Sequence, residues 1–367
     1  MMDTEAWLLL NRVPGLGAST YNKLLEHFGD PRRALNARGA DLKHAGLSQA
    51  LISSLQAMDE TAIAADIDWL ALDGHHLLSM HDARYPPLLK HISDPPPILY
   101  VRGDPDFLQQ PQLAMVGSRN PTASGRRTAL EFARHLSAAG ITITSGLAAG
   151  IDGACHEGAL QGIGSSVALV AHGLDIVYPA SHHQLAEHIA ASGAIVSEMP
   201  IGTGPQRGLF PRRNRLISGI SLGTLVVEAA LKSGSLITAR HAMEQGREVF
   251  AIPGSIHNPL ARGCHQLIRQ GAKLVETAND ILEELAPHLG VGALDESLAS
   301  PGRSTPGNQA ELDPDHKKLL KCLEYEPRSI DAIVDCSGFS AAEVASMLLI
   351  LELEGSIVCD SGLYTRI

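Results

Sequence analysis

The chain has 367 residues, of which 44% are hydrophobic and 19% are charged, and its formal net charge is −11. This composition is typical of a globular protein, and the length allows two or three domains. The five cysteines are scattered and include no C-x-x-C pair, which argues against a disulfide framework and against a zinc site. We therefore expect neither a metal nor a cofactor.

The N-terminus does not combine a basic region, an apolar core and a small-residue cleavage site, and no apolar run approaches the length of a membrane span. These features favour a cytoplasmic protein that does not contact a membrane.

The acidic total conceals one basic segment. Residues 111–273 carry 14 Lys and Arg against 9 Asp and Glu, while the segments on either side of it are acidic. A local positive field inside an acidic protein is a focused anion site. The net charge therefore does not exclude a nucleic-acid partner.

Residues 1–80 are predicted to form a small helical domain. In "LLLNRVPGLGASTYNKLLEHFG" the turn Pro14-Gly15-Leu16-Gly17 separates two segments with helical periodicity. This pattern is typical of a SAM-like or helix-hairpin-helix domain, where backbone N–H groups at the turn can hold a phosphate. A purely structural helical domain explains the acidic segment equally well, and both interpretations stay open.

Residues 81–287 are predicted to form a Rossmann-like α/β core. Prolines in 85–103 favour an extended connector that ends in the strand "ILYVRG". From residue 112 short apolar runs alternate with helical stretches, which predicts a parallel sheet covered by helices on both faces. The expected strands are 112–117, 141–146, 165–173, 194–199, 224–229 and 248–253. Ligands of such a sheet bind beyond the carboxyl ends of its strands.

A linker and a second domain are predicted to follow. Residues 288–312 are rich in Gly, Ser, Pro and acidic residues, which is typical of a linker. Residues 313–367 predict three helices and a short hairpin, a winged helix, with Ser340 as the N-cap of the third helix. That helix contains Glu343 and Glu352 but no Lys or Arg. A module that contacts protein is therefore favoured over one that reads duplex DNA.

Four stretches fall where an α/β sheet places its ligand site: Gly117-Ser118-Arg119, "TSGLAAGIDGACHEGAL", "PQRGLFPRRNRLISGIS" and "KSGSLITAR". Each alone could be structural. Together they supply glycine and serine amides at helix starts, several arginines and one aromatic ring, Phe210. Amides and guanidinium groups hold phosphates, and an aromatic ring stacks on a base. The set therefore favours binding of a phosphodiester backbone with exposed bases.

Catalysis is less well supported than binding. The carboxylates near these stretches are Asp152, Asp175, Glu198 and Glu228, and none is paired with a His at a known motif spacing. The chain contains neither G-x-S-x-G nor G-K-[ST]. We therefore expect a protein that is not an enzyme.

The same stretches resemble the DNA-processing protein A family (DprA, also called Smf). The resemblance lies in "VGSRNPTASG", "TSGLAAGIDGACHEGAL", "VALVAHGLDIVYP", "SEMPIGTGP", "FPRRNRLISGIS", "VVEAALKSGSLITARHAMEQGREVFAIPG" and "GCHQLIRQGAKLVE", collinear over about 165 residues. It implies a single-stranded DNA-binding mediator of natural transformation that protects incoming strands. Such proteins help load the RecA recombinase onto DNA covered by single-strand-binding protein, and usually act as homodimers without enzymatic activity.

The resemblance also implies residue roles. Gly117, Ser118 and Arg119 would hold a phosphate, Phe210 would stack on or wedge a base, and Gly234, Ser235 and Thr238 belong to a phosphate loop. The remaining candidate DNA-contacting residues are Ser145, Gly146, Arg207, Arg212, Asn214, Arg215 and Arg240.

Two other classes of function stay open. "SLGTLVVEA" distantly resembles the LOG-type nucleotide phosphoribohydrolases, which use a G-G-x-G-T-x-x-E loop. Here the glycine pair is missing, and Glu228 lies one residue late for that pattern. A scaffold that binds only proteins is the third possibility.

Overall fold

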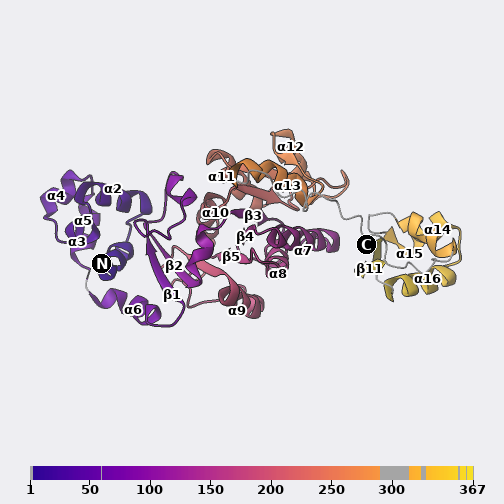
Figure 1. Ribbon diagram of the computed structural model, residues 1–367, viewed down its shortest axis with the longest axis horizontal. Coiled ribbons are helices and arrows are strands. Elements are labelled where there is room, and N and C mark those ends of the chain that lie inside the picture. The colour runs from indigo at the N-terminus through magenta and orange to yellow at the C-terminus, as the bar shows by residue number, and fades with distance from the viewer. Residues whose placement is uncertain are drawn as a thin grey trace. The chain divides into compact units, whose positions relative to one another are not determined.

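The computed structural model describes residues 3–58, 60–289, 314–323, 328–353, 356–360 and 362–366 of the chain. The chain divides into two units, Met1–Val291 and Gly292–Ile367 (Figure 1). The predicted linker 288–312 lies outside the described residues from position 290 onward.

Short helices occupy the first seventy residues, as the sequence predicts. The predicted turn joins the first two helices, with Gly15 in the left-handed region at φ 81°. Side chains of Asp3, Asp30 and Ser48 cap three of the helix starts by accepting backbone N–H groups. The elements are α1 (Thr4–Arg12), α2 (Ala18–Phe28), α3 (Pro31–Leu35), α4 (Gly39–His44), α5 (Gln49–Gln56), η1 (Glu60–Ile63) and α6 (Ala64–Leu70).

Among the described residues, nine strands form one sheet in the order β1-β2-β6-β5-β4-β3-β7-β8-β9. From β6 to β9 the strands are parallel, as predicted, but β2 runs antiparallel to β6 and β1 antiparallel to β2, so the sheet is mixed. The strands are β1 (His75–Ser79), β2 (Ile98–Gly103), β3 (Gln112–Val116), β4 (Thr142–Ser145), β5 (Ser166–Leu169), β6 (Ala194–Ser197), β7 (Gly223–Val226), β8 (Glu248–Ala251) and β9 (Lys273–Leu274).

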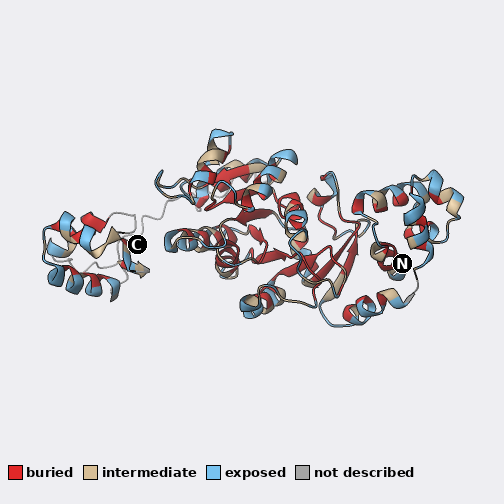
Figure 2. Cartoon of the chain, turned by 180° about the vertical axis from the view of Figure 1, so that it is seen from behind, coloured by how far each residue is buried: buried red, intermediate tan, exposed pale blue. Residues whose placement is uncertain are grey.

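Helices cover both faces of the sheet because side chains alternate between the faces along each strand. Leu113 and Met115 of β3 pack on the side of α7 (Ala123–Ala138), α8 (Ile151–Ala159) and α13 (Ala278–Leu285). Ala114 and Val116 pack on the side of α10 (Leu209–Ile220), α11 (Ser235–Glu244) and α12 (Arg262–Arg269). Figure 2 shows the strands as the most buried layer. The remaining elements are η2 (Leu88–His91), η3 (Pro105–Gln109), η4 (Ala180–His182), α9 (His183–Ser192) and η5 (Ala286–His288).

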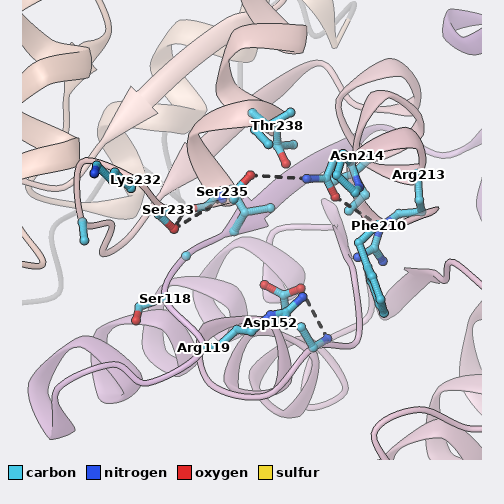
Figure 3. A pocket seen from close by; sticks show the side chains of 18 of the residues that line it. Ser118, Arg119, Asp152, Phe210, Arg213, Asn214, Lys232, Ser233, Ser235 and Thr238 are labelled. Atoms are coloured by element: carbon cyan, nitrogen blue, oxygen red, sulfur yellow. Dashed lines mark hydrogen bonds between the residues drawn. The ribbon is translucent and has the colours of Figure 1, made fainter. Parts of the chain in front are cut away.

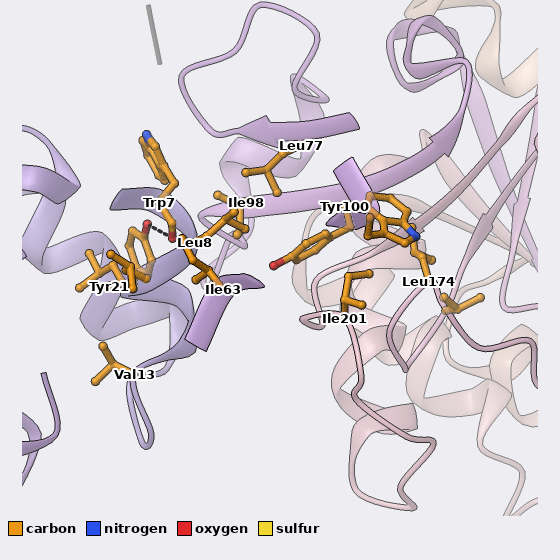
Figure 4. Close-up of a cluster of buried hydrophobic side chains, with 14 of the residues drawn as sticks. Trp7, Leu8, Val13, Tyr21, Ile63, Leu77, Ile98, Tyr100, Leu174 and Ile201 are labelled. Carbon is orange, nitrogen blue, oxygen red and sulfur yellow. Dashed lines mark hydrogen bonds between the residues drawn. The ribbon is translucent and has the colours of Figure 1, made fainter. Parts of the chain in front are cut away.

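The N-terminal helices share a hydrophobic cluster with one end of the sheet. Trp7 and Tyr21 from the helices belong to the same buried cluster as Ile98 and Tyr100 of β2 and Ala186 of α9 (Figure 4). Tyr21 is almost fully buried, and its hydroxyl donates to the carbonyl of Trp7 at 3.1 Å. The helical region is therefore packed on the sheet.

The second unit has the predicted winged-helix elements and its own core. Leu319, Ile333, Val344 and Leu348 are among its buried side chains. Ser340 caps the third helix, as predicted, through a reciprocal pair of bonds with Glu343. The elements are α14 (Pro314–Leu323), β10 (Arg328–Ser329), α15 (Ile330–Ser337), α16 (Ala341–Leu353), β11 (Ile357–Asp360) and β12 (Leu363–Arg366), and the two-residue strand β10 was not predicted.

In the described part of the chain, no single helix has both the length and the apolar composition of a membrane span, although α15 and α16 meet both criteria as a pair bent by 109°. The same part contains no group of three His, Cys, Asp or Glu side chains arranged to hold a metal ion.

Candidate functional site

The principal cavity of the first unit lies where the strand order reverses. β3 has β4 on one side and β7 on the other, so the loops that follow β3 and β7 diverge to opposite faces of the sheet. A cavity of about 820 Å³ opens between them (Figure 3). It is lined by residues from the loop after β3, the start of α8, α10, and the segment 230–238.

Nine of the fourteen predicted site residues line this cavity. They come from three of the four predicted stretches and are Gly117, Ser118, Arg119, Arg207, Phe210, Asn214, Gly234, Ser235 and Thr238. The sheet topology therefore brings together residues that are more than a hundred positions apart in the chain.

Cations and aromatic rings occur together in the cavity. Arg119, Arg207 and Lys232 line it, and no described acidic side chain forms an ion pair with any of them. The guanidinium carbon of Arg119 lies 5.4 Å from the ring centroid of Phe210. Tyr178 also lines the cavity, and its ring centroid lies 5.9 Å from that of Phe210 at an interplanar angle of 48°. The cavity can therefore attract an anion and offer flat apolar faces.

The turn that carries Arg119 is held by backbone contacts. The Ser118 N–H donates to the carbonyl of Glu228 at 2.8 Å, and the Ser118 carbonyl accepts from the N–H of Ile151 at 3.1 Å. Gly117 packs so closely on Ile151 that an added Cβ would lie 2.6 Å from that side chain. The first glycine of the motif is therefore required by packing of α8.

Hydroxyl and amide groups form the opposite wall. Ser233 and Ser235 hydroxyls lie 2.6 Å apart, and the Asn214 amide donates to the carbonyl of Gly234 at 3.3 Å. Because α11 begins at Ser235, the positive end of its dipole lies at this wall. Hydroxyl groups at a helix N-terminus are suited to a phosphate.

Two buried charged side chains, Arg213 and Asp152, form part of the cavity lining. Arg213 donates through Nη1 to the carbonyl of Gly146 at 2.8 Å, while Asp152 accepts from the N–H of Gly146 at 3.1 Å. Burial lowers the pKa of Arg213 to about 10, and burial raises the pKa of Asp152 although Arg213 opposes it. An added Cβ at Gly146 would lie 2.5 Å from Arg213, so this glycine is needed for the close approach.

Two histidines hold the next residue, Leu147, at a positive φ of 56°. The Leu147 N–H donates to His156 Nε2 at 3.3 Å, and its carbonyl lies 3.0 Å from His182 Nδ1. His156 is fully buried, and this burial lowers its pKa to about 3, so it is neutral at pH 7 and can accept the bond. The histidines therefore maintain a backbone shape that leucine rarely adopts.

Five predicted residues lie outside the cavity lining. Ser145 is buried and donates to the carbonyl of Met115 at 2.6 Å, and Gly146 contacts Arg213 as described. Arg212 and Arg215 both pair with Glu198, Arg215 at 2.6 Å. Arg212 lies on the face of α10 opposite Phe210 and Asn214, because two positions turn a helix by about 200°, and Arg215 is turned about 100° away from Asn214. Arg240 is exposed on α11.

The carboxylate of Glu228, on which the phosphoribohydrolase hypothesis depends, has a structural role. It accepts from the backbone N–H of Thr122 at 2.9 Å and from the Thr122 hydroxyl at 2.6 Å. Thr122 in turn caps α7. An added Cβ at Gly125 would lie 2.3 Å from this carboxylate, so Glu228 is packed against the start of α7.

Sequence reasoning left out several residues that line the cavity, among them Asn120, Asp152, Tyr178, Arg213, Lys232 and Ser233. Lys232 and Ser233 lie in the predicted stretch "KSGSLITAR" but were not named among its contact residues. Tyr178 lies nine residues beyond β5, and no local pattern marks its return to the site.

The fold and the cavity define an α/β protein with a basic, aromatic-lined cavity at the switch point of its sheet. A family model described as DNA recombination-mediator protein A matches residues 76–286. Models of the SMF/DprA SAM domain and of the DprA winged-helix domain match residues 1–66 and 303–362. The chain belongs to the DprA/Smf family, as the resemblance implied.

Full-length relatives and solved structures agree with this assignment. The chain is 40% identical to protein Smf of Escherichia coli (strain K12) over 100% of this chain and 96% of that one. It resembles the crystal structure of DNA processing protein A from Streptococcus pneumoniae, with a TM-score of 0.69 and 35% identity over 77% of this chain and 99% of that one. A structure of the Helicobacter pylori protein, described by its single-stranded DNA binding mode, matches with a TM-score of 0.53 and 30% identity over 58% and 97%. These matches do not favour the LOG-type alternative.

Proposed function

We propose that this protein binds single-stranded DNA in the cavity at the switch point and acts as a recombination mediator. The observation that carries the proposal is the joint presence of Arg119, Arg207 and Lys232 around the Phe210 ring, without ion pairs to described acidic side chains. The single-stranded DNA binding described for the Helicobacter pylori relative supports it.

Each part of the cavity has a role in this proposal. Arg119, Arg207 and the hydroxyl wall of Ser233 and Ser235 bind consecutive phosphates, while Phe210 and Tyr178 stack on bases. Base stacking on an aromatic ring contributes about 1–3 kcal/mol per base and depends little on sequence. Single strands are preferred over duplexes because paired bases are not free to reach Phe210.

We propose that the protein performs this function in natural transformation. There it protects incoming single strands and helps load the RecA recombinase, including onto strands covered by single-strand-binding protein. The description of the family as recombination mediators supports this role. The protein acts here without catalysis and as a homodimer in a cytoplasmic setting. Of the predicted domains, 1–80, 81–287 and 313–367, the central one carries DNA binding.

The test is a titration of fluorescent single- and double-stranded oligonucleotides across a range of salt concentrations, followed by anisotropy. We expect tighter binding of the single strand and an affinity that falls steeply with salt, with a slope of about 0.7 per phosphate contacted. Arg134→Ala is the matched control, since Arg134 is exposed in the same basic segment and does not line the cavity. Equal affinity for both DNA forms, or no dependence on salt, would contradict the proposal.

The enzymatic alternative has its own assay. Purified protein incubated with nucleoside 5′-monophosphates is expected to release no free base. RecA loading is measured separately, as recombinase filament formation on strands covered by single-strand-binding protein, with and without this protein.

A further inference from the structure

The N-terminal helices hold the sheet through both polar groups of one backbone residue, Ile201. The Ile201 N–H donates to Asp66 Oδ1 at 3.1 Å, and its carbonyl accepts from Arg12 Nη2 at 2.8 Å. Asp66 in α6 and Arg12 at the end of α1 also form an ion pair with each other. An ion pair of the helical region therefore clamps one peptide residue of the segment 198–208, which connects β6 to α10.

The Asp66 side of the clamp is buried, the Arg12 side chain is 22% exposed, and the carboxylate oxygens of Asp66 are hydrogen-bonded. Asp66 is fully buried, Ile201 is 7% exposed, and the Tyr100 hydroxyl donates to Asp66 Oδ1 at 3.0 Å. Figure 4 shows the Ile201 side chain in the cluster that contains Tyr100 and Leu174. A buried ion pair with its hydrogen bonds made is costly to break, because removal of one partner leaves an unpaired charge.

The segment beyond the clamp leads directly into the cavity. Gly202 donates to Asp175 Oδ1 at 3.0 Å, and the Thr203 carbonyl accepts from Gly173 at 2.8 Å. A Cβ added at Gly204 or at Gly208 would meet no heavy atom within 4 Å. This stretch carries Arg207, which lines the cavity six residues after Ile201. Its path is therefore set on one side by the clamp together with the Gly202 and Thr203 bonds, and on the other side by α10.

We infer that Arg12 and Asp66 are positioning residues for the DNA site: by clamping Ile201, they hold Arg207 in the cavity. The inference rests on the proposed function. It assigns the N-terminal helices a role in binding that requires no contact between them and DNA. The alternative from the sequence, a phosphate grip at the Pro14–Gly17 turn, requires such a contact.

The first test needs no DNA. Arg12→Met removes the bond to the Ile201 carbonyl while keeping a long side chain. Trypsin is expected to cleave the Arg207–Gly208 bond of this variant several-fold faster than that of the wild type, because cleavage follows the population of the open segment. Arg33→Met is the matched control, since Arg33 lies in the same helical region and pairs only locally with Asp30. An unchanged cleavage rate would overturn the inference.

The second test asks whether the clamp acts through Arg207. Arg12→Met should weaken single-stranded DNA binding by up to about tenfold, the loss expected for one charged contact. Combined with Arg207→Ala it should cause little further loss, whereas combined with Arg119→Ala the losses should add, because coupled residues are non-additive and independent ones are additive. Full additivity with Arg207→Ala would mean that the clamp does not position that residue.

Folding and function are separated by two further measurements. Circular dichroism and thermal unfolding show whether Arg12→Met is folded, and Asp66→Asn, which keeps the side-chain volume, is measured in the same way if it is not. If the wild type fails to bind single strands, the proposed function is wrong, but the trypsin comparison still decides whether Arg12 restrains the Arg207 segment. If the wild type binds and Arg12→Met and Asp66→Asn behave like it in both tests, only the positioning role is wrong.

Discussion

Arg119 and Phe210 are in contact across the cavity, with the guanidinium carbon 5.4 Å from the ring centroid. Arg119 follows β3, and Phe210 lies in the first turn of α10, so the contact joins the loop after β3 to the start of α10. A cation against an aromatic ring contributes about 0.5–2 kcal/mol. Each side chain therefore orients the other, and a charged group and a stacking face are offered to a ligand together.

Arg119→Ala should weaken binding of single strands of every sequence, because it removes a phosphate contact. We expect a loss of about tenfold near physiological salt and a salt slope that is lower by about 0.7. Anisotropy titrations at several salt concentrations measure both quantities. A slope equal to that of Arg134→Ala would remove Arg119 from the phosphate contacts.

Phe210→Ala should reduce affinity by about 1–3 kcal/mol with an unchanged salt slope, since the lost interaction is stacking. Phe210→Trp keeps an aromatic face and should retain most of the affinity. Because Phe210 is only half-buried, neither change should alter the melting temperature much. A Phe210→Ala protein with normal affinity and reduced stability would place the ring in the core instead.

Arg215→Ala should act on stability rather than on phosphate contacts. It removes the 2.6 Å partner of the buried Glu198 carboxylate and leaves it Arg212 at 3.3 Å, so the loss should stay below the roughly 3–5 kcal/mol of a buried charge left unpaired. Urea unfolding measures the loss. Asn214→Ala, one position earlier on the cavity side of α10, is the matched control and should leave stability nearly unchanged. A lower salt slope in folded Arg215→Ala would restore Arg215 as a DNA contact.

His156 makes stability depend on pH in a predictable direction. Its pKa in the folded state is lowered to about 3, below the usual 6.5, so the unfolded chain binds the proton more readily. The stabilising contribution is complete above pH 6.5 and is lost as the pH falls from there toward 3. His156→Gln, which can accept from Leu147 but does not titrate, should show a flatter decline in unfolding free energy between pH 7 and 4.5. Parallel declines in the two proteins would contradict this assignment.

Ending the chain after residue 311 should leave affinity for single strands nearly unchanged. The third helix of the winged-helix unit carries Glu343 and Glu352 and no basic residue, so it offers nothing that would neutralise phosphates. The truncated and full-length proteins are compared in the same titration. A large loss of affinity on truncation would show that the winged helix contacts DNA.

The strands of the core were predictable because each is a short run of apolar and β-branched residues bounded by a glycine or a helix. β1 was not, since "HHLLS" lacks such a run and becomes a strand by pairing with β2 at the edge of the sheet. The antiparallel arrangement of β2 also depends on contacts between distant segments, which no local pattern encodes.

Within the site, the Gly117–Arg119 turn and the Gly234–Ser235 loop were predictable from topology, because carboxyl ends of parallel strands meet at one edge. The sequence alone did not distinguish the roles of the arginines in α10. Their roles depend on the phase of the helix: Arg213 is buried in the cavity lining, while Arg212 and Arg215 pair with Glu198. Glu198 precedes them by more than ten residues, and its burial follows only from the packed fold.

The adjacency of β3 and β7 means that the two walls of the cavity are synthesised far apart. Arg119 leaves the ribosome more than a hundred residues before Ser235, and three of the strands made in between, β4, β5 and β6, lie on the other side of β3. A nascent chain or a proteolytic fragment that ends before α11 therefore lacks one wall of the cavity. An oligonucleotide at a free concentration of a hundred times its Kd should raise the unfolding free energy of the complete protein by about 2.7 kcal/mol, because the ligand binds only the folded protein.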